Sequence, residues 1–360
     1  MSQPSSGIFP KIYLERCSRY RFSYSQCHYC REVCPHDALQ LSEQGVELEA
    51  GKCANCGLCS SACPTNVFHA AHIPTSKLLQ AEKDISVSCL PSQIEAELTV
   101  PCLGAIDAVV MSELAQRGIE VTLKGSSHCE ECAHAPQGKQ ILKETLAAVE
   151  SLCQSMSDDS WIKPRLDNDI KANNGVDRAR AGRRQFFRRF LASGVAAAQS
   201  NEPLIKHKVL ETAVRPAAHY IPQKRKLLSK ITKECDSIIL NEDVAFTFSV
   251  GIVSATEDCS GCEICSRVCP TGALSIHEED KTWQLHIFGD RCLGCGLCIE
   301  SCSYNAIELN PIIASAAQDN ILHSLYRYRC QSCGRHFVHS DSDLCPVCKD
   351  DEESFDAIFN

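Results

Sequence analysis

The spacing of the cysteines between residues 259 and 302 limits more than any other feature how this chain can fold. Two runs there each hold three cysteines separated by pairs of residues, and a fourth cysteine follows after three more residues. The two runs are Cys259, Cys262, Cys265, Cys269 and then Cys292, Cys295, Cys298, Cys302. Closely spaced thiolates in tight loops converge on metal, so hydrophobic packing alone does not explain the pattern.

Composition separates a metal protein from a disulfide scaffold. The chain has 26 cysteines among 360 residues, and most of them fall in C-x2-C pairs. Its opening stretch, MSQPSSGIFPKIYLERC, contains no apolar signal segment, so we expect reduced thiolates and a cytoplasmic protein. No stretch approaches the run of about 18 apolar residues that spans a membrane, so any membrane association would pass through a partner complex. No C-x-x-C pair is followed by histidine, which excludes c-type haem attachment.

Residues 255–310 closely resemble a bacterial-type ferredoxin with two [4Fe–4S] clusters. The segments ALSIHE and WQLHIF fit the hairpin between its two cysteine runs. The resemblance implies that the fourth cysteine of each run binds the other cluster, with a pair of zinc knuckles as the alternative. The implied ligand sets are Cys259, Cys262, Cys265, Cys302 and Cys269, Cys292, Cys295, Cys298.

The stretch CANCGLCSSACP repeats this pattern near the N-terminus and needs a partner run. The partner, CHYCREVCP, has Tyr24 where its first cysteine should stand. Cys17 is the one unassigned cysteine within reach, and a longer loop costs little entropy. An intact cluster is therefore predicted, with a three-cysteine [3Fe–4S] site as the alternative. The ligand sets are Cys17, Cys27, Cys30, Cys63 and Cys34, Cys53, Cys56, Cys59.

Strands alternate with helices between about residues 85 and 153. ISVSC, LTVPC and IEVTLKG predict strands, whereas AIDAVVMSELAQRG and GKQILKETLAAVESL predict helices. A parallel sheet would gather Cys89, Cys102, Cys129 and Cys132 at one edge, as a [2Fe–2S] site, a zinc site or plain buried cysteines. The strand–cysteine pattern and PCLGAID resemble the delta subunit of viologen-reducing hydrogenases, which implies an electron-transfer module.

The last cysteine block, YRCQSCGRHFVHSDSDLCPVC, resembles a zinc ribbon. Its two knuckles supply four thiolates, which suit a closed structural zinc site, and a rubredoxin-type iron is the alternative. The four cysteines are Cys330, Cys333, Cys345 and Cys348. These six sets leave only Cys153 and Cys235 unassigned.

A basic linker separates the blocks. Residues 163–230 contain 16 Lys and Arg against 5 Asp and Glu, whereas residues 235–312 contain 3 against 12. The linker is therefore expected to fold over the acidic cluster domain or to dock a redox-enzyme partner, and the zinc ribbon is the other expected docking surface. Arg183, Arg184, Phe186 and Phe187 resemble a twin-arginine export signal, although an amphipathic docking helix fits the same residues and their place inside the chain.

The sequence thus predicts an α+β multidomain protein. The expected domains are a 2[4Fe–4S] ferredoxin-like domain at 1–78, a small α/β domain at 79–153, a basic linker at 154–234, a second 2[4Fe–4S] domain at 235–314 and a zinc ribbon at 315–360.

Function is predicted from what the motifs contain and lack. There is no dinucleotide fingerprint after a strand, no phosphate-binding P-loop and no nucleophile–base arrangement, so no small-molecule substrate is evident. The basic linker is not accompanied by a motif that reads the grooves of a nucleic acid, so no nucleic-acid partner is expected. The prediction is a carrier rather than a catalyst, one that relays single electrons to or from a molybdopterin- or hydrogenase-type oxidoreductase. The alternative is an assembly factor that binds a redox enzyme before export.

Overall fold

The computed structural model describes most of the chain. The described residues are 9–70, 72–156, 160–167, 213–215, 217–235, 237–314, 319–339, 343–345 and 347–349. The twin-arginine-like residues Arg183, Arg184, Phe186 and Phe187 lie outside them. Among the described helices, none has the length and apolar character that crossing a membrane requires.

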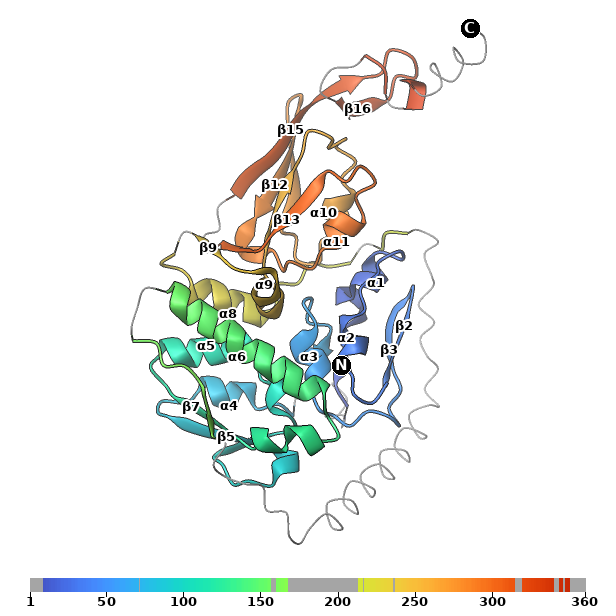
Figure 1. Ribbon diagram of the computed structural model, residues 1–360. Helices are drawn as coiled ribbons and strands as arrows, with labels where there is room; N and C mark the ends of the chain where they lie inside the picture. Colours follow the sequence, from blue (N-terminus) through green and yellow to red (C-terminus); the bar gives the residue numbers. More distant parts are fainter. Residues whose placement is uncertain are drawn as a thin grey trace, which may run out of the picture.

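The first ferredoxin-like domain, residues 9–70, consists of two small antiparallel pairs and short helices (Figure 1). Strand β1 (Lys11–Ile12) pairs with β4 (Phe68–His69), and β2 (Leu39–Ser42) forms a hairpin with β3 (Gly45–Leu48). The helices are α1 (Ser18–Arg21), α2 (Tyr29–Glu32) and α3 (Leu58–Ala62). Phe68 and Leu39 anchor a small core that several cysteines complete.

The α/β domain follows and is built on a parallel sheet of order β6-β5-β7-β8. Its strands are β5 (Ile85–Cys89), β6 (Leu98–Val100), β7 (Val121–Lys124) and β8 (Arg165–Asp167). Its helices are α4 (Thr75–Leu79), α5 (Ala108–Gln116) and α6 (Gln137–Ser155). The predicted strands and helices are present, whereas β8 was not foreseen. Asp107 caps α5, since its carboxylate accepts a 2.9 Å hydrogen bond from the amide of Val109.

Two later helices complete the core of the α/β domain. Helix α8 (Gln223–Ile231) packs on α5, and α9 (Glu242–Phe248) packs on α6. Leu228 and Phe248 are 0% and 1% exposed, within the same cluster as the strands. Helix α8, inside the predicted linker, and helix α9, beyond it, therefore share one hydrophobic core with the strands of the α/β domain.

The second ferredoxin-like domain, residues 250–314, repeats the plan of the first. Strand β10 (Ile252–Ala255) pairs with β13 (Ile307–Asn310), and β11 (Leu274–Glu279) forms the predicted hairpin with β12 (Thr282–Phe288). Trp283, Leu285 and Ile287 alternate along β12 and are 1%, 0% and 1% exposed, because one face of the strand is buried. The helices are α10 (Ile264–Val268) and α11 (Leu297–Glu300), and β9 (Ser237–Ile239) pairs with β14 (Ile312–Ala314).

The C-terminal hairpin extends this domain. Strand β15 (Asp319–Arg329) pairs with β12 and with β16 (His336–His339), giving a sheet of order β11-β12-β15-β16. Figure 1 shows the hairpin projecting from the end of the molecule opposite the α/β domain. Short 3-10 turns connect elements elsewhere, at Leu14–Arg16, Leu90–Ser92, Leu103–Ala105, Ser126–Glu131 and Gly289–Arg291.

Candidate iron–sulfur and metal sites

The first thiol group, here the Cys17 quartet, contains Cys17, Cys27, Cys30 and Cys63. Burial raises the pKa of Cys27 to about 12, and negative charge on Cys63 and Cys17 adds to it. Burial also raises the pKa of Cys30, with further contributions from Cys63, Cys17 and Cys27. Cys17 is 7% exposed and lies where the 3-10 turn at 14–16 passes into α1. The structure thus brings this distant cysteine to the other three.

The Cys53 quartet, which contains Cys34, Cys53, Cys56 and Cys59, lies beside it. Burial raises the pKa of Cys56 to about 11, and the charges of Cys34 and Cys53 contribute. The pKa of Cys59 is raised well above its ordinary value by burial and then by Cys56 and Cys53. Cys34 therefore faces the second run rather than its own, which is the exchange of fourth cysteines that the sequence predicts.

Two quartets in the second ferredoxin-like domain each line a cavity. The Cys269 quartet (Cys269, Cys292, Cys295, Cys298) lines one cavity together with Pro270 and Leu297. The Cys259 quartet (Cys259, Cys262, Cys265, Cys302) lines another together with Trp283. Burial raises the pKa of Cys265 to about 12, with contributions from Cys259 and Cys262. Each cavity has all four thiols on its wall.

The chemistry of these donors fits a polynuclear iron centre. Crowded, buried thiols such as Cys27, Cys56 and Cys265 resist ionisation, because burial and the charge of neighbouring thiolates both raise the pKa. Bound iron would offset that repulsion and keep the sulfurs ionised. In the second ferredoxin-like domain, the four cysteines of each predicted ligand set line one cavity. A [4Fe–4S] cluster would supply reversible one-electron chemistry at such a site.

Hydrogen bonds to sulfur repeat between the domains. The amides of Ala38, Val67 and Ala306 each donate to the thiol four residues earlier, at 3.4, 3.4 and 3.3 Å. The buried hydroxyls of Thr65 and Thr271 lie 3.6 and 3.7 Å from the sulfurs of Cys63 and Cys269. Such bonds tune a cluster, and the threonines were missed although both follow a Cys-Pro pair.

The quartets are arranged in a row. Charge on a cysteine of one quartet raises the pKa of a cysteine in the next quartet as well as within its own. The pairs that connect neighbouring quartets are Cys265–Cys298, Cys27–Cys295, Cys30–Cys59 and Cys56–Cys102. The order is therefore the Cys259, Cys269, Cys17 and Cys53 quartets, and then the cysteines of the α/β domain. Cys27 and Cys295 belong to different ferredoxin-like domains, and nothing in the sequence analysis predicts that they lie near each other.

The α/β domain gathers the Cys89 quartet, which contains Cys89, Cys102, Cys129 and Cys132, beyond the carboxyl ends of its strands. Burial raises the pKa of Cys102 to about 12, and Cys56, Cys129 and Cys89 contribute in that order. Burial also raises the pKa of Cys129 to about 11, and charge on Cys89 and on Cys132 makes the next largest contributions. The predicted four cysteines lie together, which disfavours their being unrelated buried side chains.

A hydrogen bond ties the Cys53 and Cys89 quartets together. His36 Nε2 lies 3.1 Å from His134 Nδ1, and the amide of His134 donates to the sulfur of Cys132 at 3.5 Å. His36 follows Cys34 closely in the chain, so the pair connects two thiol groups through side chains.

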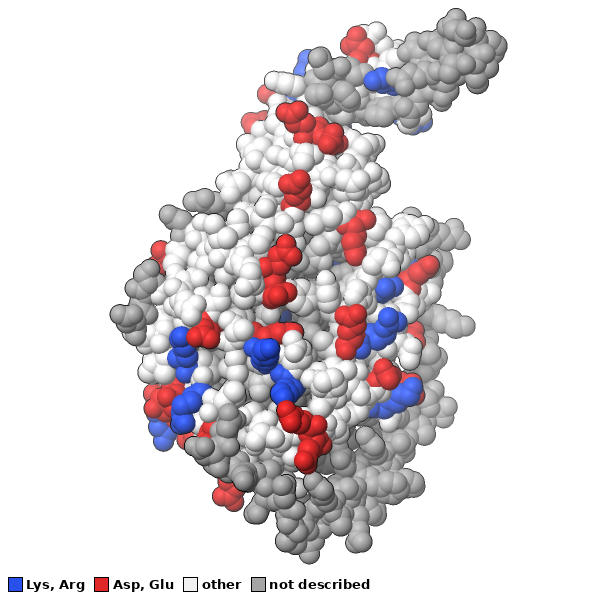
Figure 2. Space-filling view, viewed as in Figure 1, with Lys and Arg blue, Asp and Glu red and all other residues white. Residues whose placement is uncertain are grey.

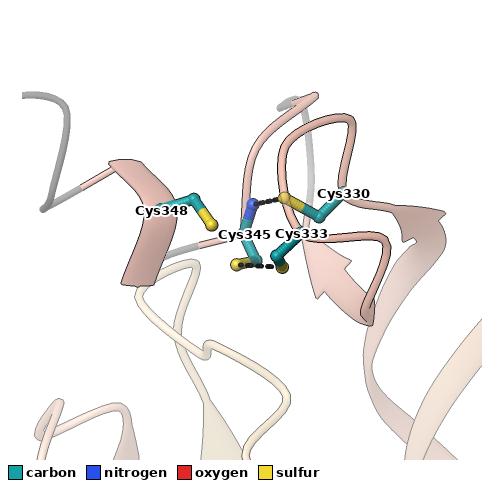
Figure 3. A group of neighbouring side chains, drawn as sticks. All are labelled: Cys330, Cys333, Cys345 and Cys348. Atoms are coloured by element: carbon teal, nitrogen blue, oxygen red, sulfur yellow. Dashed lines mark hydrogen bonds between the residues drawn. The ribbon is translucent and has the colours of Figure 1, made fainter.

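The Cys330 quartet lies at the tip of the C-terminal hairpin and contains Cys330, Cys333, Cys345 and Cys348. Figure 3 shows the four side chains turned toward a common point. Their sulfur atoms all lie within 4.8 Å of one another. The amide of Cys345 donates to the sulfur of Cys330 at 3.3 Å. Backbone amides of Cys333 and Cys345 lower the pKa of Cys330 to about 6. Four sulfurs at this separation suit a tetrahedral ion.

The two cysteines left over lie elsewhere. Cys153 is buried on α6 in the core of the α/β domain. Cys235 packs against the same core, with its sulfur 3.6 Å from that of Met156. Neither contributes to a quartet, as the sequence predicts.

Comparison with known proteins agrees with this geometry. The family model described as a 4Fe-4S dicluster domain matches residues 25–67 and again residues 258–306. The chain is 37% identical over 68 residues to the electron transport protein HydN of Escherichia coli K12, covering 18% of this chain and 37% of HydN. It is 34% identical over 83 residues to the polyferredoxin MvhB of Methanothermus fervidus, covering 23% of this chain and 19% of MvhB.

A third relative is the pyruvate synthase subunit PorD of Methanocaldococcus jannaschii. It is 41% identical over 51 residues, which is 14% of this chain and 56% of PorD. The matches therefore span about a fifth to just over half of each relative. The repeated match and these relatives confirm the predicted ferredoxin character: the chain contains two 4Fe–4S dicluster domains, at residues 25–67 and 258–306, in one polyferredoxin-like polypeptide.

Proposed function

We propose that this chain is an iron–sulfur electron carrier that relays single electrons to or from a partner oxidoreductase. The observation that carries the proposal is the row of quartets, in which neighbouring thiol groups act on one another from Cys265 to Cys102. A storage or structural role would not need sites in series. Sulfur-bound cubes suit transfer because charge spreads over several irons.

Each quartet has an assigned cofactor in this proposal. The Cys17, Cys53, Cys259 and Cys269 quartets each hold a [4Fe–4S] cluster, with Cys17 as the fourth ligand of the first. The Cys89 quartet holds a [2Fe–2S] cluster at the end of the row. The Cys330 quartet holds Zn²⁺, because a closed set of four thiolates without a neighbouring redox site suits a structural ion.

The partner is proposed to be a molybdopterin- or hydrogenase-type enzyme in the cytoplasm. HydN is named as an electron transport protein and PorD as a subunit of pyruvate synthase, and both names support a redox-enzyme partner. On the face drawn in Figure 2, acidic side chains run down the second ferredoxin-like domain. A partner with a basic surface near its own redox centre would dock there.

Anaerobic metal analysis with EPR tests the proposal. We expect about 16 to 18 iron atoms and about one zinc per chain. Reductive titration should reveal several centres that are reduced and reoxidised reversibly by one electron each. A colourless protein, or one with only a few iron atoms, would overturn the proposal.

A further inference from the structure

Two buried arginines reach the second ferredoxin-like domain from outside it, Arg21 from the end of α1 and Arg225 from α8. Arg21 and Arg225 are 0% and 1% exposed, although arginine is charged at every accessible pH and is almost never fully buried unless paired. Both lie beside the Cys269 quartet. A docking role for a basic surface does not explain why these two cations are buried beside the Cys269 quartet.

Arg21 reaches this quartet from the first ferredoxin-like domain. Its Nη1 donates to the carbonyl of Cys269 at 3.3 Å, its Nη2 to Ala218 at 2.5 Å and its Nε to Glu15 at 2.9 Å. All three acceptors are neutral carbonyls, so these bonds hold the guanidinium without cancelling its charge. The negative groups that act on it most strongly are the thiolates of Cys269 and Cys295, ahead of the Glu15 carboxylate.

Arg225 approaches from α8. Its Nε donates to the carbonyl of Cys292 at 3.0 Å, and its Nη2 to that of Gly289 at 2.7 Å. Charge on Cys292 acts on it first, followed by the Asp290 carboxylate. Each guanidinium thus has one carboxylate in its surroundings, Glu15 or Asp290, and each donates to the carbonyl of a cysteine of the Cys269 quartet.

The Cys259 quartet has the opposite surroundings. The exposed carboxylates Glu257 and Asp258 directly precede Cys259, and Cys262 is itself exposed. The nearby cation, Arg267, is paired with Glu263 at 3.1 Å. The Cys269 quartet therefore has two buried guanidiniums against its backbone, whereas the Cys259 quartet has exposed carboxylates beside it.

We propose that Arg21 and Arg225 hold the centre at the Cys269 quartet at a higher reduction potential than the centre at the Cys259 quartet. The inference rests on the proposed function. Reduction adds one negative charge, and a fixed positive charge in a poorly screened interior stabilises it. An electron that a low-potential one-electron donor delivers to the outer, Cys259 quartet then moves to the Cys269 quartet, one centre being oxidised as the other is reduced, with no proton required.

An EPR-monitored redox titration of the full chain tests the inference. The variants are Arg21→Gln and Arg225→Gln, which remove the charge, and Arg21→Lys and Arg225→Lys, which keep it. Cys269→Ser identifies the signal of that quartet. We expect each glutamine variant to lower the midpoint potential at the Cys269 quartet, the double variant to lower it further, and each lysine variant to restore most of the shift.

Arg215→Gln is the matched control. Arg215 is also buried, at 7% exposed, but its guanidinium donates to the carbonyls of Tyr20 and Glu43, at 3.0 and 2.8 Å, rather than to a carbonyl of the Cys269 quartet. Its loss should leave the potential at the Cys269 quartet unchanged.

Two results would overturn the inference. One is an unaltered chain in which the Cys259 quartet is reduced at the higher potential. The other is a glutamine variant that retains its iron and its potential. A chain that binds no clusters would instead overturn the proposed function, so the two failures are distinguishable.

Discussion

The amide of Gln26 donates a 3.2 Å hydrogen bond to Oε1 of Glu300, and this bond joins the two ferredoxin-like domains next to Cys27 and Cys295. The rings of Tyr29 and Phe246 also contact each other, with their centroids 4.4 Å apart and their planes tilted by 51°. The two domains thus meet through the loops that carry their cysteines. A path for electrons that crosses the molecule depends on this junction.

Replacing Cys17 tests the most unusual ligand. We expect Cys17→Ala to lose between about one and four iron atoms per chain, since the Cys17 quartet would lack one thiolate and either shed one iron or lose its cube. Iron analysis and EPR of the anaerobic protein measure the loss. Cys153→Ala is the control, because Cys153 is buried without joining a quartet. Unchanged iron and spectra in Cys17→Ala would contradict the assignment.

A pair of glycines tests the packing behind the Cys269 quartet. Both Gly294 and Gly296 have positive φ, at 58° and 72°. A Cβ on Gly294 would lie 2.2 Å from the carbonyl oxygen of Val250, whereas a Cβ on Gly296 would meet nothing within 4 Å. Alanine at either site carries a backbone cost of about 1 to 2 kcal/mol, and only Gly294→Ala adds a clash.

We therefore expect Gly294→Ala to lower the melting temperature and the iron content, and Gly296→Ala to change them much less. Thermal unfolding under anaerobic conditions, with iron measured on the same samples, makes the comparison. Equal effects of the two substitutions would show that the contact with Val250 does not position the loop.

The Cys330 quartet should hold its metal independently of the clusters. We expect Cys330→Ala to remove about one zinc per chain and to leave the iron content as it was, because the four sulfurs lie together at the tip of the hairpin. Elemental analysis of zinc and iron gives the answer. Cys235→Ala serves as the control, and iron in place of zinc at the tip would favour a rubredoxin-type site.

The Cys89 quartet is tested by its most exposed pair. We expect Cys129→Ala with Cys132→Ala to remove about two iron atoms and the visible absorption of a dinuclear centre, leaving the four cubes intact. Cys129 and Cys132 line no part of the hydrophobic core of the α/β domain, so the fold should survive. Loss of one zinc instead of iron would reassign the site.

The local parts of this fold follow from the sequence, whereas the contacts between them do not. The ferredoxin resemblance and two strand-like segments predicted the hairpin of β11 and β12, and apolar periodicity predicted α5 and α6, because these elements depend on neighbours in the chain. Strand β8 was missed since Arg165, Leu166 and Asp167 carry no strand pattern, and it forms only by pairing with β7. The pairing of β15 with β12 likewise depends on the tertiary structure.

The site shows the same division. Spacing placed each cysteine in its group, and loop reach was enough to suggest Cys17. Arg21 and Arg225 were missed, because an arginine in a basic stretch normally lies at the surface. The residues that flank the two arginines in the sequence do not indicate that the guanidiniums donate to the carbonyls of Cys269 and Cys292. The order of the quartets also depends on how the domains pack.

The packing of α9 on α6 has a consequence for how such a protein can be divided. Cleavage of the chain near residue 234 would separate α9, which carries Val244 and Phe248, from α6, which carries Ala148 and Val149. A broad apolar face would then be exposed on each fragment. The two halves are therefore not interchangeable cassettes. Each half covers apolar surface of the other, and neither is expected to be stable alone.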